Sequence, residues 1–84
     1  MKNKDKILYE IKMACSRVFD KDAKIFLENT KKGDIEEWDS MQHLMLMAEL
    51  EAEFSIRFTT KEISCLDSID KLLEAILRKV GNKQ

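Results

Sequence analysis

The sequence contains no proline and only two glycines, so few positions can interrupt a helix. It has no apolar run approaching the roughly 20 residues that a membrane-spanning helix needs. The first twelve residues, MKNKDKILYEIK, also lack the apolar core of a signal peptide. We therefore expect a cytoplasmic protein that does not enter a membrane.

Cysteine is scarce, and the two cysteines, Cys15 and Cys65, lie far apart with no CxxC spacing and no histidine beside either of them. Zinc sites and redox pairs need such clustering. Neither is indicated here, and we expect both cysteines to be small buried hydrophobic residues.

A concentrated basic face is missing too. Residues 1–32 hold nine basic and five acidic residues, residues 33–66 hold two and eight, and residues 67–84 hold four and three. Binding to nucleic acid requires a cationic face that neutralises phosphates. The acidic middle of the chain argues against nucleic acid as the main ligand.

The chain is long enough for one small domain, and its composition favours helix. It has 84 residues, of which 44% are apolar and 37% charged, with abundant Lys, Glu, Leu, Ile and Met. A single domain over residues 1–84 leaves no room for a deep pocket between domains. We therefore expect a protein that does no chemistry of its own, and a monomer.

Helical spacing of apolar residues predicts two outer helices. The first runs from about Lys4 to Phe19. The last follows a cap at Asp67 or Ser68 and stops at Gly81. Their apolar faces consist of Ile7, Leu8, Ile11, Ala14, Cys15 and Val18, and of Ile69, Leu72, Leu73, Ile76, Leu77 and Val80.

Residues 20–39 lose this spacing and form a long first loop, which can include a short helical turn. We expect its apolar residues to anchor it to the core: Ile25, Phe26, Leu27, Ile35 and Trp38. After it, Asp39 is placed to cap a helix from Ser40 to about Phe54, and Thr59 or Thr60 to cap a short helix through residues 61–63. The prediction is an all-α four-helix bundle with three longer helices and one short helix.

The helix from Ser40 has two apolar stripes, whereas a surface helix of a small monomer needs one. The core stripe contains Leu46, Met47, Leu50 and Phe54, with a half-covered His43 among them. The second stripe flanks Ser40 and contains Met41, Leu44, Met45, Ala48 and Ala52. This second stripe is either a docking surface for other proteins or a contact with the chain's own loop or short helix.

Two stretches carry a resemblance to a known family. Residues 38–44, WDSMQHL, and residues 48–58, AELEAEFSIRF, resemble the Asp-Ser-Leu attachment motif and second helix of acyl carrier proteins. The order and lengths of the predicted elements are also similar to that family over nearly the whole chain. The Asp-Ser pair alone is a weak signal, and its position at a helix start after a long loop strengthens it.

The resemblance implies that Ser40 carries a covalent 4′-phosphopantetheine arm. A phosphopantetheinyl transferase would install the arm from coenzyme A, with Mg²⁺ in its own site, and acyl- or aminoacyl-loading and transfer enzymes would then use it. Asp39 would cap the helix and could orient the serine or a metal during transfer. The positions that partners read in the family correspond here to Met41, Leu44, Met45, Ala48, Glu51 and Glu53.

Departures from the family pattern refine this hypothesis. Met41 replaces the usual leucine, which conserves volume. Met45 and Gln42 stand where carriers of general fatty acid synthesis typically have acids. The second helix is therefore less acidic, which suggests a dedicated carrier in a specialised biosynthetic pathway. A peptidyl or aminoacyl carrier, and an unmodified helical interaction module, remain alternatives.

Two other sites are disfavoured by spacing. Asp39, Ser40 and His43 contain the residue types of a hydrolytic triad, but the serine and histidine diverge on the helical wheel and no nucleophile elbow is apparent. The acidic run from Asp34 to Asp39 lacks the alternating ligands and central glycine of a calcium loop. It is better interpreted as a solvated acidic segment, and no metal site is expected.

Overall fold

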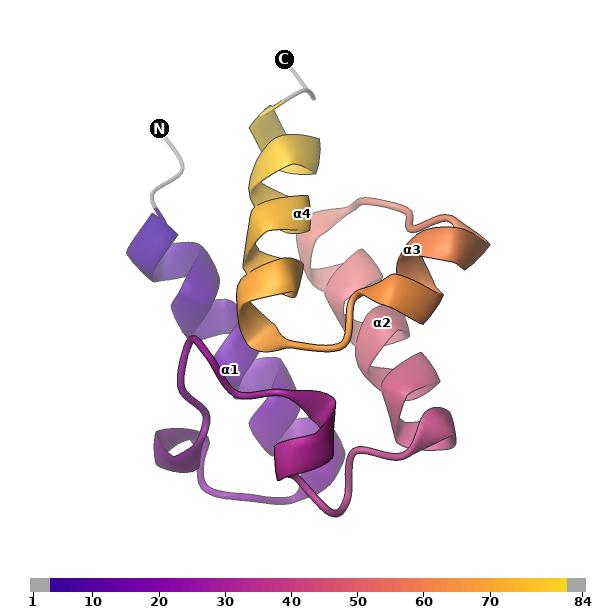
Figure 1. Cartoon of the computed structure of the whole chain (residues 1–84). Coiled ribbons are helices and arrows are strands. Elements are labelled where there is room, and N and C mark those ends of the chain that lie inside the picture. Colours follow the sequence, from indigo (N-terminus) through magenta and orange to yellow (C-terminus); the bar gives the residue numbers. More distant parts are fainter. Residues whose placement is uncertain (1–3, 82–84) are drawn as a thin grey trace.

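The computed structural model describes residues 4–81, and these form the expected all-α bundle (Figure 1). Four α-helices are present in this part of the chain: α1 (Lys4–Phe19), α2 (Ser40–Phe54), α3 (Thr60–Cys65) and α4 (Ile69–Gly81). The bounds of α1, α2 and α4 confirm the predicted helices, and α3 includes the predicted residues 61–63 but extends beyond them at both ends. The long first loop contains two short 3-10 turns, Ala23–Ile25 and Lys32–Asp34.

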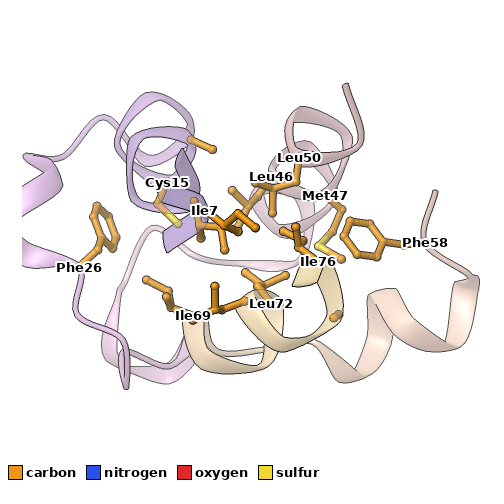
Figure 2. Close-up of a cluster of buried hydrophobic side chains, with 14 of the residues drawn as sticks. Ile7, Cys15, Phe26, Leu46, Met47, Leu50, Phe58, Ile69, Leu72 and Ile76 are labelled. Atoms are coloured by element: carbon orange, nitrogen blue, oxygen red, sulfur yellow. The ribbon is translucent and has the colours of Figure 1, made fainter. Parts of the chain in front are cut away.

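Helix α1 packs against both α2 and α4 and runs in the opposite direction to them (Figure 1). The core stripes of the three helices meet in one cluster (Figure 2), whose fully buried members include Ile7, Ile11, Cys15, Leu46, Met47, Leu50, Ile69, Leu72 and Ile76. Burial raises the pKa of the Cys15 thiol to about 12. This cysteine therefore stays protonated and acts as a core residue.

Three of the five apolar residues expected to anchor the long loop do so: Phe26 and Trp38 are buried, and Ile35 packs partly buried against the core. The rings of Phe26 and Trp38 both contact Phe19, with centroid separations of 5.9 and 5.3 Å. Ile25 and Leu27 are instead 46% and 57% exposed, so the prediction was wrong for them. The backbone is extended at Phe26, where neighbouring side chains point to opposite sides, so Ile25 and Leu27 face away from the core that Phe26 enters.

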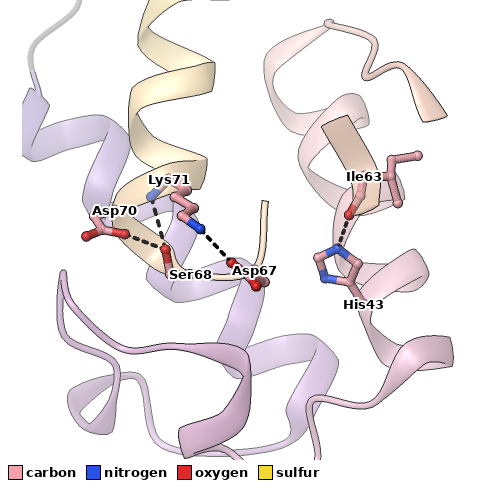
Figure 3. A network of polar contacts seen from close by, with 6 residues as sticks. All are labelled: His43, Ile63, Asp67, Ser68, Asp70 and Lys71. Atoms are coloured by element: carbon pink, nitrogen blue, oxygen red, sulfur yellow. Dashed lines mark hydrogen bonds and ion pairs between the residues drawn. The ribbon is translucent and has the colours of Figure 1, made fainter. Parts of the chain in front are cut away.

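Backbone hydrogen bonds tie the end of this loop to the α3–α4 connection. The N–H of Ile69 donates to the carbonyl of Thr30 at 2.9 Å, and the N–H of Lys32 donates to the carbonyl of Asp67 at 2.8 Å. On the same connection Ser68 hydrogen-bonds Asp70 and accepts from the N–H of Lys71 at 3.4 Å (Figure 3). The two backbone bonds fasten the loop beside the start of α4.

None of the residues of helix α3 is fully buried: Ile63 packs partly buried against the core, and polar contacts hold the ends of the helix. Thr59 and Glu62 form a capping box in which each side chain accepts the other's N–H, at 3.1 and 2.8 Å. Glu62 also pairs with Lys79 of α4 at 3.0 Å. Cys65 at the end of α3 is exposed, which corrects the expectation that it is buried: this short helix packs only in part against the core, through Ile63, and leaves Cys65 in solvent.

The Glu62 carboxylate makes α3 sensitive to acid. Its hydrogen bond from the Thr59 N–H and its pairing with Lys79 lower the pKa of Glu62 below its ordinary value of 4.5. The stabilisation is therefore complete above that ordinary value and is lost as pH falls through the lower folded-state pKa. Urea unfolding at several values between about pH 6 and pH 3 measures this loss of stability. It should be smaller in Glu62→Gln than in the original sequence, and as large as in the original sequence in the surface control Glu74→Gln.

Candidate functional site

The N-terminus of α2 carries the Asp-Ser pair in the geometry predicted for a helix cap. Asp39 has extended backbone angles, and its Oδ1 accepts the N–H of Gln42 at 2.9 Å. Its carbonyl accepts the N–H of His43 at 2.8 Å. Ser40 is the first helical residue and is exposed to solvent. Its hydroxyl is thus presented at the end of the helix where unpaired N–H groups and the positive end of the dipole lie.

Removing the cap should cost stability without removing the serine. Asp39→Ala loses the bond to the Gln42 N–H, and we expect the free energy of unfolding to fall by about 1 kcal/mol. Asp39→Asn can still accept this hydrogen bond and should lose less. Urea unfolding followed by circular dichroism measures both. Equal losses in the two variants would show that the charge of Asp39, and not its capping bond, stabilises the helix.

A surface pocket lies beside Ser40 where α2, α3 and the loop meet. It is lined by Lys32, Ser40, His43, Leu44, Ile63, Ser64 and Asp67. Sequence reasoning placed Ser40 and Leu44 at the site but not Lys32 or the α3 residues. Nothing local in the sequence indicates these neighbours, because the pocket is assembled by the backbone bonds between the loop and the α3–α4 connection.

His43 lies at the inner side of this pocket and is buried, with 7% of its surface exposed, rather than half-covered as expected. The Trp38 Nε1–H donates to Nδ1 of the imidazole at 2.9 Å. The other ring nitrogen, Nε2, is 2.6 Å from the carbonyl oxygen of Ile63 in α3 (Figure 3). Both nitrogens are therefore occupied, and neither can act as the base of a Ser-His pair with Ser40.

The second stripe of α2 is exposed. Met41, Leu44 and Met45 are 72%, 57% and 51% accessible, and Ala48 and Ala52 are also exposed. No part of the chain between residues 4 and 81 covers this stripe, so the alternative that it packs on the loop or on α3 is wrong. We call Met41, Leu44, Met45, Ala48 and Ala52 the exposed α2 surface.

The acidic residues of α2 lie in its second half, and its first turn has none. Glu49 pairs with Arg17 of α1 at 3.2 Å. Glu51 is half-buried and accepts the N–H of Phe58 at 2.8 Å, so it supports the turn after α2. Glu53 is exposed. The surface beside Ser40 is therefore apolar and uncharged over most of its length.

The acidic loop residues ahead of Ser40 take part in structural contacts. Glu37 pairs with Lys21 at 2.9 Å, which lowers the pKa of Glu37 and raises that of Lys21. Asp34 accepts the N–H of Lys31 at 2.9 Å. Residues 4–81 contain no group of three His, Cys, Asp or Glu side chains placed to hold a metal ion. Over the same range, no helix has the length and apolarity to cross a bilayer.

Comparison with known proteins gives a similarity at the level of solved structures. No protein-family model and no curated protein sequence matches the chain. Among solved structures, the chain is similar to the solution NMR structure of a holo acyl carrier protein from Geobacter metallireducens. The TM-score is 0.81 and the sequences are 29% identical, over 90% of this chain and 87% of the other. The chain therefore has the fold of an acyl carrier protein, and this neighbour supports the resemblance to that family seen around Ser40.

Proposed function

We propose that this carrier protein presents acyl cargo as a thioester of a 4′-phosphopantetheine arm on Ser40. The observation that carries the proposal is the exposed Ser40 hydroxyl in the first turn of α2, directly after the Asp39 cap. The similar Geobacter protein is a holo form, which agrees with a carrier that is modified. The protein itself supplies position and recognition, while the chemistry belongs to the arm and to partner enzymes.

Attachment of the arm is a phosphoryl transfer. The Ser40 Oγ would attack the phosphorus of coenzyme A that bears the pantetheine, and the phosphoanhydride bond would break. Adenosine bisphosphate would leave, and the serine proton would pass to a base of the transferase. The new phosphodiester would sit at the positive end of α2, and the Lys32 side chain, which lines the same pocket, brings a cation near it.

Modification of the full chain by a phosphopantetheinyl transferase with coenzyme A and Mg²⁺ tests the proposal. Intact-protein mass spectrometry should show one phosphopantetheinyl adduct, and peptide mapping should place it on the segment that contains Ser40. A chain that remains unmodified by several transferases, while a known carrier is modified in the same reactions, would favour the unmodified interaction module.

The partners would dock on the exposed α2 surface through apolar contact. Its three largest side chains are more than half exposed, and two of them are methionines, which adapt to varied surfaces. Its paucity of acids is the reason for proposing a specialised pathway with dedicated partners. A general fatty acid synthase, whose own carrier typically has acids at the positions of Gln42 and Met45, should use this protein poorly.

Introducing acids at positions 42 and 45 should raise the rate at which the general synthase uses this protein. Electrostatic steering changes association rates by factors of 10 or more, so Gln42→Asp with Met45→Glu should raise the rate of acyl transfer about tenfold at low salt. A control with two new acids on the loop, Leu27→Glu with Asn29→Asp, should leave it unchanged. If the general synthase already uses the original sequence as fast as its own carrier, the proposal of a dedicated pathway fails.

A further inference from the structure

The pocket beside Ser40 has one wall from α2 and one from α3, and α3 is the less firmly held of the two. Leu44 belongs to the first wall, and Ile63 and Ser64 to the second. A helix of six residues is unstable by itself, and α3 buries none of its residues completely; its Ile63 packs partly buried against the core. The width of the pocket therefore depends on whatever fixes α3 relative to α2.

The bond between His43 and Ile63 provides such a connection close to Ser40. Ile63 is in the last turn of α3, where carbonyl groups lack partners within the helix. The N–H of Asp67, which would be its helical partner, donates instead to the carbonyl of Cys65 at 3.0 Å. The imidazole of His43 takes the open position at 2.6 Å (Figure 3). The Glu62–Lys79 pair, by contrast, ties α3 to α4 and not to α2.

Trp38 determines the tautomer of the His43 imidazole. An indole nitrogen can only donate, so Nδ1 of His43 must accept the Trp38 N–H and carries no proton. In the neutral ring the proton is then on Nε2, which donates to the Ile63 carbonyl. The Trp38 ring is itself held against Phe19 of α1, with 5.3 Å between ring centroids. A continuous series of contacts therefore runs from the core through Trp38 and His43 to α3.

We propose that His43 is a positioning residue for the arm: held in one tautomer by Trp38, it fixes α3 as the second wall of the pocket through the carbonyl of Ile63. The role of the arm rests on the proposed function, whereas the effect on α3 does not. The imidazole takes no part in attaching the arm, because both of its nitrogens are bonded within the protein.

Three substitutions separate the two bonds of His43. In His43→Gln, the amide nitrogen lies as many bonds from the backbone as Nε2 and can donate to the Ile63 carbonyl. In His43→Asn, the amide oxygen corresponds to Nδ1 and can accept only from Trp38. His43→Phe keeps a ring and loses both bonds. If the phenylalanine variant does not fold, the asparagine and glutamine pair still decides the question.

The first measurement is made on the protein without an arm. In NMR spectra, the nitrogen-15 chemical shifts of the His43 imidazole should report a protonated Nε2 and an unprotonated Nδ1. Amide exchange at Ile63 and Leu66, whose N–H groups bond within α3, should be about tenfold faster in the Asn and Phe variants and near the original rate in the Gln variant. Rates are compared with core amides of α4, which correct for any change in global stability.

The second measurement uses the four proteins after reaction with the transferase and coenzyme A. In the original and Gln proteins, attachment of the arm should change the NMR chemical shifts of the Leu44, Ile63 and Ser64 amides. In the Asn and Phe variants only the Leu44 shift should persist. Equal exchange and equal shifts in all four proteins, or rescue by Asn instead of Gln, would overturn the inference. Absence of an adduct in every protein would refute the proposed function, and the exchange rates would still decide the role of His43.

Discussion

Replacing Ser40 with alanine should abolish the phosphopantetheinyl adduct completely. The methyl group cannot attack phosphorus, and no other group takes the place of the Ser40 oxygen at the first turn of α2. Alanine is the most favourable helix-forming residue, so the variant should keep its fold, with a stability change within about 0.5 kcal/mol. Intact-protein mass spectrometry after transferase treatment measures the adduct, and circular dichroism confirms the fold.

Ser64 supplies a matched control for this experiment. It is an exposed serine that lines the same pocket from α3, and its hydroxyl donates to the carbonyl of Thr60 at 3.2 Å. Ser64→Ala should be modified as fully as the original sequence. An adduct that persists in Ser40→Ala would show that the transferase uses another residue, and the assignment of the arm to Ser40 would have to be abandoned.

Phe26→Ala should cause the largest loss of stability among the loop substitutions. Phe26 is 0% exposed, and its ring contacts Phe19. Truncation of a buried phenylalanine typically costs about 3–5 kcal/mol, because apolar contacts are lost and a cavity remains. A small domain has only about 5–15 kcal/mol of stability, so the variant should be close to unfolding. Urea unfolding followed by tryptophan fluorescence measures the change, since Trp38 belongs to the same aromatic cluster.

The adjacent Leu27 is the control for Phe26. It is 57% exposed, and we expect Leu27→Ala to change stability by no more than about 0.5 kcal/mol. If both substitutions were equally mild, the loop would not be anchored by Phe26, and the position of Trp38 at the end of the same loop would need another explanation.

The long helices were predictable because their sequence spacing and their packing agree. The apolar residues of α1 and α4 repeat at helical intervals, and nearly all of them face the same core. The start of α2 was equally clear, since Asp39 is followed by a helix that needs a cap. At α3 the two adjacent threonines were indistinguishable, and the structure selects Thr59 because its hydroxyl accepts the Glu62 N–H. Such a choice depends on backbone angles that composition does not encode.

The polar interior of the site could not be predicted. The burial of His43 depends on Trp38 from the loop and on a carbonyl of α3, and a backbone acceptor has no signature in the sequence. The same holds for Ile25 and Leu27, which have the same apolar character as Phe26 but face solvent. Their exposure follows from the extended backbone at Phe26, where neighbouring side chains alternate between the core and solvent.

The two backbone bonds that join Thr30 to Ile69 and Lys32 to Asp67 have a mechanical consequence. They clamp both ends of the segment that carries the Ser40 helix and α3, so this segment leaves the scaffold and returns to it at one place. If the packing of α2 against α1 changed, the segment between the clamps would move while these two bonds kept its ends beside the start of α4.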